Sequence, residues 1–270
     1  MSDTPPTRAP APRPIAAETS RTGTVQAVDR ALLILETLAE DEEGYRLTDL
    51  AALTGLSTST VHRLLTTLER RRFVQIDQSS GLWHVGRQAF QVGATFARRR
   101  NFVPPALPFL RRLRDQTRET ANLGIVDDGE IVVLTQVESR EIMRAITRIG
   151  GRVPIATSGM GKAILATYPP ADVATRLAGR RPRGGEALAA ELEAIRRQGY
   201  AVDDEAHVPG LRCVAAVVYN DRAEPLCAIS VSGLAGRLTP ARLDGLGRLV
   251  RDTAKELTQV LGGTWPAPPA

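Results

Sequence analysis

Residues 47–73 read LTDLAALTGLSTSTVHRLLTTLERRRF and set the fold of the first part of the chain. Gly55 and Leu56 mark a turn between two short helical patterns. Ser57 is a good N-cap for the second helix, because its hydroxyl can accept a backbone N–H left free in the first turn. The apolar residues of the second helix recur at helical spacing and form one buried stripe, Val61, Leu64, Leu65 and Leu68. The pattern predicts a helix-turn-helix.

The opposite face of the second helix is polar and carries no carboxylate before Glu69. Hydrogen-bonding side chains without anionic repulsion suit a helix that enters the major groove. Two helices joined by a glycine turn are common in α-helical proteins, so geometry alone leaves DNA binding and simple packing both open. The residues expected to contact DNA are Ser57, Thr58, Ser59, Thr60, His62, Arg63, Thr66, Arg70, Arg71 and Arg72. His62 and Arg63 should face base edges, and the three arginines at the helix end should hold phosphates.

A β-hairpin is predicted directly after this helix. Residues 73–77 and 82–85 are rich in β-branched and aromatic residues, and they flank a turn that ends in Gly81. A hairpin in this position is typical of the wing of a winged helix-turn-helix, whose tip can lie along the phosphate backbone or in the minor groove. The same hairpin can close the small core through Trp83 and Val85, and the two roles are compatible.

Charge is segregated along the chain. The formal net charge is +5, yet residues 57–100 hold eight arginines against two acids, a balance of +6, while residues 31–50 hold one arginine against six acids, a balance of −5. A basic region of this kind indicates phosphate contact. Lys162 and Lys255 are the only lysines, a bias typical of a GC-rich genome. The positive charge of this region is therefore stronger evidence for DNA contact than the choice of arginine over lysine.

Length and composition bound the remaining architecture. A chain of 270 residues with 43% hydrophobic content can build two ordinary domains. Residues 1–22 are rich in Pro, Ala, Thr and Arg without an apolar core, which predicts a disordered arm and not a signal peptide. No run approaches the roughly 20 apolar residues that span a bilayer. Cys213 and Cys227 do not make a disulfide framework, so we expect a reduced, cytoplasmic setting.

The predicted domains are a winged helix-turn-helix over 23–86, a linker helix over 87–101, an α+β domain over 102–263 and a tail over 264–270. The first helix should run over about 25–40, with its inward residues being Val28, Ala31, Leu32, Leu35 and Leu38. The linker helix places Phe90, Ala94 and Ala97 on one face. That face suits either dimerisation or packing against the first domain.

The second domain alternates between helical and strand patterns. Strands are expected near 121–126, 131–138, 142–148, 212–219 and 226–232, and helices near 106–120, 159–168, 171–178, 186–198 and 239–261. Hairpins with flanking helices predict an α+β fold with an antiparallel sheet, the architecture of small-molecule sensor domains.

Catalytic and metal-binding alternatives each fail a check. Gly161 and Lys162 suggest a phosphate-binding loop, but positions 156 and 163, which that motif requires to be Gly and Ser or Thr, are both Ala. Cys213 with His207 and Asp203 suggests a thiol hydrolase, but His207 is six residues away in a predicted loop and no oxyanion motif follows. The histidines are not spaced as metal ligands. We therefore expect no enzyme activity, no metal and no cofactor.

The order of these elements, together with five short motifs, strongly resembles the IclR family of bacterial transcriptional regulators, and within it the acetate-operon repressor type, which controls the glyoxylate bypass. The motifs are GGRVP at 150–154, SGMGKA at 158–163, DDEAH at 203–207, GLRCVA at 210–215 and ISVSG at 229–233. The resemblance covers about 23–263. It implies a DNA-binding domain and a GAF-like effector domain, assembled as a homodimer or a dimer of dimers on double-stranded operator DNA.

The resemblance also implies an effector pocket for glyoxylate or pyruvate. Its positions correspond to Ile142, Gly159, Met160, Asp203, Cys213, Ser230 and Ser232. Ser230 and Ser232 are two apart on a predicted strand, so both can donate to one carboxylate, and Gly159 precedes a helix whose free N–H groups favour an anion. Met160 departs from the family pattern, which has alanine there.

The sequence thus predicts a transcriptional regulator, a repressor of a carboxylate-catabolism operon, controlled by a small carboxylate. An activator of an aromatic-acid operon in the same family stays open, because Met160 can swing aside and leave a more apolar wall. A metabolite-binding or enzymatic protein that uses Cys213 is the alternative from another class.

Overall fold

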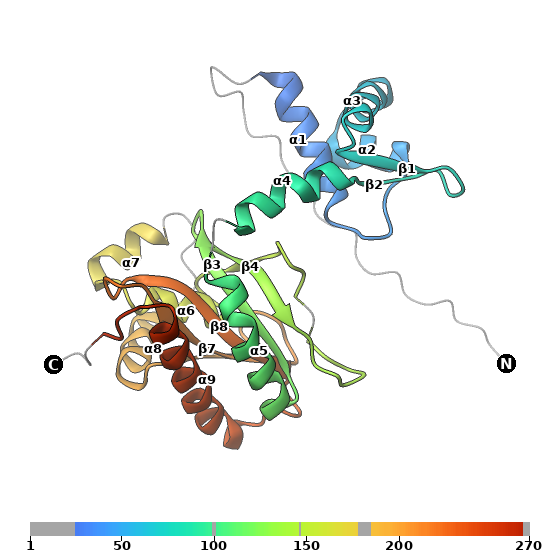
Figure 1. Cartoon of the computed structure of the whole chain (residues 1–270). Coiled ribbons are helices and arrows are strands. Elements are labelled where there is room, and N and C mark those ends of the chain that lie inside the picture. Colours follow the sequence, from blue (N-terminus) through green and yellow to red (C-terminus); the bar gives the residue numbers. More distant parts are fainter. Residues whose placement is uncertain (1–24, 99–100, 146, 178–184, 267–270) are drawn as a thin grey trace. The chain divides into compact units, whose positions relative to one another are not determined.

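The computed structural model describes residues 25–98, 101–145, 147–177 and 185–266 (Figure 1). The chain forms two compact units, residues 1–99 and 100–270, and each is described by itself. The arm expected over residues 1–22 lies outside the described residues.

The first unit is a winged helix-turn-helix. Its elements are α1 (Gln26–Leu38), α2 (Leu47–Thr54), α3 (Thr58–Arg70), β1 (Val74–Asp77), β2 (Leu82–Val85) and α4 (Arg87–Arg98). Gly55 ends α2 in the left-handed conformation (φ 67°) that glycine adopts without strain, and it creates the predicted turn. The two strands pair antiparallel from Val74 opposite Val85 to Asp77 opposite Leu82. The core is formed by Ile34, Leu38, Leu50, Val61, Leu65, Val74 and Trp83.

The prediction for the buried face of the first helix is partly wrong. Val28 and Leu32 are 55% and 52% exposed, whereas Ile34 and Leu38 are buried. The C-terminal half of α1 therefore packs into the core of this unit, and the apolar side chains of its first half stay uncovered. On the linker helix α4, Phe90 is 77% exposed, so its ring is also left uncovered within this unit.

The second unit is built on a six-stranded antiparallel sheet in the order β5-β4-β3-β8-β7-β6. Its strands are β3 (Thr120–Asp127), β4 (Glu130–Val137), β5 (Arg152–Pro154), β6 (Ala201–Asp204), β7 (Leu211–Tyr219) and β8 (Pro225–Leu234). Its helices are α5 (Val103–Thr117), α6 (Gly159–Leu165), α7 (Pro170–Arg176), α8 (Gly185–Gln198) and α9 (Pro240–Val260). Helices α5 and α9 pack on one face of the sheet, and α6 packs on the other, with α7 and α8 in the same apolar cluster. The predicted α+β class is confirmed.

Two predictions for this sheet need correction. The described residues of 142–148, which exclude residue 146, do not form a strand; the neighbour of β4 is instead β5, with Val153 opposite Ile131. The Thr120 hydroxyl holds the chain on either side of Ile142: it donates to the Ala145 carbonyl at 2.8 Å and accepts from the Ser139 backbone N–H at 3.1 Å. The short edge strand β6 was missed, because four residues ending in two aspartates carry little strand signal.

The chain continues to pack beyond the predicted end of the effector domain at residue 263. The Thr264 backbone N–H donates to the Asn220 carbonyl at 2.9 Å. Trp265 meets Tyr219 edge to face, with ring centroids 5.2 Å apart. Residues up to Pro266 are thus part of the second unit as the structure describes it, and the rest of the predicted tail, 267–270, lies outside the described residues.

Candidate nucleic-acid interface and effector site

Helix α3 begins as the sequence predicts. The Ser57 hydroxyl accepts the Thr60 backbone N–H at 3.3 Å and lies 2.8 Å from the Thr60 hydroxyl. Ser59 is also within hydrogen-bond distance of Ser57, at 3.1 Å. Ser57 and Thr60 are therefore occupied in capping the helix, while Thr58 and Ser59 remain exposed at its first turn.

The outer face of α3 offers two long side chains. His62 and Arg63 are exposed, and no ion pair or side-chain hydrogen bond engages either of them among the described residues. The Thr66 hydroxyl donates to the His62 carbonyl at 2.8 Å, so only its oxygen lone pairs remain for a ligand. The buried positions of α3 are Val61 and Leu65, which orients His62 and Arg63 away from the core, as a recognition helix requires.

The C-terminal end of α3 exposes Arg70, Arg71 and Arg72. Arg72 has a φ of 62°, a left-handed conformation that costs a residue with a Cβ roughly 1 kcal/mol. The Phe73 backbone N–H then donates to the Leu68 carbonyl at 2.9 Å, which closes the helix end. The left-handed conformation at Arg72 thus lets the chain turn from the end of α3, where the three arginines are exposed, into β1 of the wing.

The wing turn itself is acidic. The Asp77 carboxylate accepts the Ser79 backbone N–H at 2.9 Å, the Ser79 hydroxyl at 2.7 Å and the Ser80 hydroxyl at 2.8 Å. These hydrogen bonds, chiefly those from Ser79, lower the pKa of Asp77 to about 2. A carboxylate that stays ionised at the wing tip repels phosphate, so the basic surface of this unit is concentrated at the end of α3.

In the second unit, strand pairing gathers five polar residues that are distant in sequence. Asp203 on β6 lies opposite Cys213 on β7, and Cys213 lies opposite Ser232 on β8. Two residues along β8, Ser230 lies opposite Asn122 on β3. Because side chains alternate between the faces of a strand, all five share the face that α6 covers. We call Asn122, Asp203, Cys213, Ser230 and Ser232 the polar cluster.

Asn122 organises the two serines. Its Nδ2 lies 3.3 Å from the Ser230 Oγ and 3.2 Å from the Ser232 Oγ, and both Asn122 and Ser230 are buried. An amide that donates to both hydroxyl oxygens leaves their O–H groups to donate elsewhere, and both serines are within hydrogen-bonding reach of the Cys213 thiol. Two buried oxygens beside them have no hydrogen-bond partner among the described residues, Oδ1 of Asn122 and Oε1 of Gln136, and Gln136 is the β4 residue opposite Asn122. Unsatisfied buried acceptors of this kind call for a donor.

The Cys213 side chain forms part of the wall of the polar cluster, beside the start of α6. A Cβ placed on Gly159 would lie 3.0 Å from the Cys213 Sγ, so only glycine fits comfortably at the start of α6. Burial raises the pKa of Cys213 to about 11. The thiol is therefore protonated at neutral pH and is a poor nucleophile.

Charge in the polar cluster comes from Asp203 and from a lysine behind it. Asp203 is 5% exposed, and its carboxylate accepts the backbone N–H groups of Ala206 at 2.9 Å and His207 at 3.2 Å. Burial nevertheless raises the pKa of Asp203 above its ordinary value. The buried Lys162 ammonium donates to the Glu191 carboxylate and to the Val202 carbonyl, and its positive charge acts on both Asp203 and Cys213.

Six of the seven expected effector positions meet at or beside this cluster, and one does not. Met160 is buried, with its sulfur beside Gly124: a Cβ added there would lie 3.1 Å from Met160 Sδ. Ile142 is 96% exposed because its segment does not form the expected strand. Sequence reasoning missed Asn122, Gln136 and Lys162. A polar residue such as Asn122 inside an otherwise apolar strand was the available signal.

Each unit matches a domain model of the same family. Residues 27–78 match the model of the IclR helix-turn-helix domain, and residues 94–259 match the bacterial transcriptional regulator IclR C-terminal model. The chain belongs to the IclR family. It is a transcriptional regulator with a helix-turn-helix domain, and the relatives that it resembles are transcriptional regulators, not enzymes.

The chain is 38% identical to the acetate operon repressor of Salmonella typhimurium, over 93% of this chain and 96% of the relative. It is 40% identical to the regulator BhcR of Paracoccus denitrificans, over 87% of each chain. Among solved structures, Thermotoga maritima IclR superposes with a TM-score of 0.72 at 25% identity, covering 88% of this chain and 99% of that one.

Two kinds of feature are absent from the described part of the chain. Within the ranges given above, no three His, Cys, Asp or Glu side chains are placed so that they could hold a metal ion. Among the same residues, none of the helices combines the length and the apolar character needed to cross a membrane.

Proposed function

We propose that this chain is a sequence-specific DNA-binding repressor whose affinity for its operator is controlled by a small carboxylate such as glyoxylate or pyruvate. The exposed face of α3, with His62 and Arg63 unpaired among the described residues, supports readout of base edges. Three exposed arginines at its end supply the phosphate contacts. The name of one relative supports the sign of regulation, since the acetate operon repressor of Salmonella typhimurium is a repressor by name.

The observation that carries the effector proposal is the contact of Asn122 with both serines. It presents two hydroxyl donors side by side on a buried face of the sheet, which matches the two oxygens of a carboxylate. Lys162 adds positive charge behind them. The unpartnered oxygens of Asn122 and Gln136 favour a ligand that also carries a donor, such as the hydrated form of a 2-oxo acid.

A small ligand is part of the proposal. Met160 and Cys213 border the polar cluster and lie so close to Gly124 and Gly159 that a larger residue at either glycine would meet them. Ile142 is 96% exposed, so its side chain would contact the bound carboxylate only if the segment 140–144 moved towards the polar cluster.

Control of DNA binding requires that the ligand bind the DNA-competent and DNA-incompetent states with different affinity.

One winged helix reads few base pairs, so we propose a homodimer, or a dimer of dimers, on two half-sites whose centres lie roughly one helical turn apart. The uncovered apolar residues of the first unit, Val28 and Leu32 on α1 and Phe90 on α4, support such an assembly.

Calorimetry on the full-length protein tests the effector proposal. Glyoxylate or pyruvate should release heat on binding, and the double substitution Ser230→Ala, Ser232→Ala should remove it. Ser79→Ala, which alters an exposed serine in the other unit, serves as the matched control and should bind normally. Absence of heat with both 2-oxo acids, together with binding of an aromatic acid that the double substitution abolishes, would favour the aromatic-acid regulator instead.

A further inference from the structure

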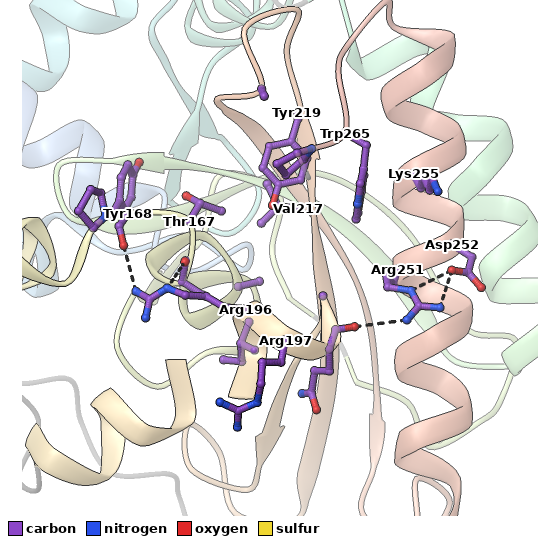
Figure 2. Close-up of a pocket in the computed structure, with 18 of the residues that line it drawn as sticks. Thr167, Tyr168, Arg196, Arg197, Val217, Tyr219, Arg251, Asp252, Lys255 and Trp265 are labelled. Atoms are coloured by element: carbon purple, nitrogen blue, oxygen red, sulfur yellow. Dashed lines mark hydrogen bonds and ion pairs between the residues drawn. The ribbon is translucent and has the colours of Figure 1, made fainter. Parts of the chain in front are cut away.

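A cavity of about 700 Å³ lies in the second unit, away from the polar cluster (Figure 2). Its walls come from the segment after α6, the ends of β7 and α8, the outer part of α9 and Trp265. Cys213 of the polar cluster and Tyr219 of the cavity stand near opposite ends of β7, so at about 3.3 Å per residue they are about 20 Å apart. We call this the α8–α9 cavity.

The α8–α9 cavity is rich in positive charge. Four cationic side chains line it, Arg196, Arg197, Arg251 and Lys255, against one acid, Asp252. In Figure 2 the two arginines of α8 lie on one side, and Arg251, Asp252 and Lys255 lie along α9.

Two of these cations are already engaged by the protein. Arg196 donates to the carbonyls of Ala166 at 2.8 Å and Tyr168 at 3.0 Å, and Arg251 pairs with Asp252 at 2.9 Å. Arg197 and Lys255 are exposed, and among the described residues no ion pair or side-chain hydrogen bond engages them. They therefore remain able to bind an anion.

Aromatic rings form another part of the wall. Trp265 meets Tyr219 edge to face, and the Arg176 guanidinium lies 3.6 Å from the centre of the Tyr168 ring. The Tyr219 hydroxyl has no hydrogen-bond partner among the described residues, and burial raises the pKa of Tyr219 to about 12. It stays protonated and can donate. Ala163, Ile195 and Val217 supply apolar surface beside these rings.

We propose that the α8–α9 cavity is a second ligand site, which takes an aromatic carboxylate. The ring would lie against Tyr219 and Trp265, and the carboxylate would pair with Lys255 on α9, while Arg197 adds positive charge from the α8 side of the cavity. The volume lies within the roughly 300–1,000 Å³ of pockets for small molecules and admits an aromatic ring with its carboxylate. Helix α6 contributes to both sites, through Gly159 and Met160 at one end and Ala163 at the other.

Trp265 provides a direct reporter, because the chain has only one other tryptophan, Trp83, in the core of the first unit. Titration of the full-length protein with benzoate should produce a saturable change in tryptophan fluorescence, and Trp265→Phe should lose that change. The neutral isostere benzamide should bind weakly or not at all. Saturating glyoxylate, and the double substitution Ser230→Ala, Ser232→Ala, should both leave a saturable benzoate signal.

The charge requirement is tested by Arg197→Gln with Lys255→Gln, which should weaken benzoate binding by about tenfold or more, as expected for the loss of charge-assisted hydrogen bonds. Arg111→Gln with Arg140→Gln removes the same charge from exposed arginines outside the cavity and should have no effect. The proposal is overturned if benzoate gives no saturable signal, if benzamide binds equally well, or if the double substitution at 197 and 255 changes nothing. It is also overturned if glyoxylate or the serine substitutions abolish the signal, since benzoate would then occupy the polar cluster. If Arg197→Gln with Lys255→Gln changed the oligomeric state of the protein but left its benzoate affinity unchanged, the proposal would also fail, and the α8–α9 cavity would instead mark an interface between copies of the chain.

Discussion

Asn122 and Ser230 face each other across β3 and β8, and the Asn122 Nδ2 lies 3.3 Å from the Ser230 Oγ. The same amide reaches Ser232 at 3.2 Å. A single buried side chain thus fixes the positions of both hydroxyl groups that we assign to the carboxylate.

Asn122→Ala should weaken pyruvate or glyoxylate binding by about tenfold, because the hydroxyls lose their orientation and the ligand loses an acceptor. The free energy of unfolding should fall by only about 1–2 kcal/mol, since the substitution also removes an unsatisfied buried oxygen. Calorimetry gives the first quantity and chemical denaturation the second. Unchanged affinity would show that the serines do not depend on this amide.

Arg63 is an exposed α3 side chain that we propose reads a base edge. Arg63→Ala should cost about 1–3 kcal/mol on the operator and relax sequence preference, if the guanidinium pairs with guanine. Arg222→Ala, an exposed arginine of the second unit, is the matched control and should bind normally. Fluorescence anisotropy with operator and random duplexes measures both effects. An equal loss on the two duplexes would make Arg63 a phosphate contact.

Arg72 combines a strained backbone with an exposed charge. Arg72→Gly should leave the free energy of unfolding unchanged or raise it by up to about 1 kcal/mol, because glycine adopts a φ of this sign without strain. DNA affinity should nevertheless fall on all sequences, and the salt dependence should decrease by about one phosphate contact. Retention of full affinity at every salt concentration would remove Arg72 from the DNA interface.

Asp203 should make effector binding depend on pH. Burial raises the pKa of Asp203 above 3.8, so the folded protein holds this proton to higher pH than the unfolded chain does. The stability contributed by the neutral carboxyl is present at low pH and is lost as the pH rises through the raised pKa. The ionised form also repels an anionic ligand. Pyruvate should therefore bind more tightly as the pH falls from neutrality towards that pKa.

The Asp203→Asn variant should lose most of this pH dependence, because an amide does not titrate. His207 lies beside Asp203 and its charge also acts on that carboxyl, so His207→Gln is the control and should retain the dependence. Calorimetric titrations at a series of pH values, from neutrality downwards, measure the effect. A pH profile that is the same in Asp203→Asn and in the unmodified protein would assign it to another group.

Local patterns were sufficient to predict much of the fold. The stripe containing Val61 and Leu65 is buried because its spacing matches the helical period, and Ser57 caps α3 because its chemistry fits that position. The face of α1 was misjudged at Val28 and Leu32, since an apolar helix has more than one plausible inward face and its neighbours decide between them. No local pattern indicates which face is covered.

The candidate effector site was predictable only in part. Ser230 and Ser232 share a strand face, which a period of two reveals. Asn122 joins them only through the pairing of β3 with β8, strands about a hundred residues apart in sequence, and register of that kind is set by the whole sheet. Ile142 was misplaced for the same reason, because β4 pairs with β5 and leaves the segment around Ile142 outside the sheet.

The most direct test of the account is a titration of the full-length protein on the DNA immediately upstream of its own gene, with and without glyoxylate and pyruvate. The account predicts that the unmodified protein binds this DNA more tightly than random duplex and that at least one of the two acids changes the affinity. The Ser230→Ala, Ser232→Ala protein should bind the same DNA equally well and ignore both acids. Equal affinity for upstream and random DNA, or an undiminished response to the acids in the serine variant, would contradict it.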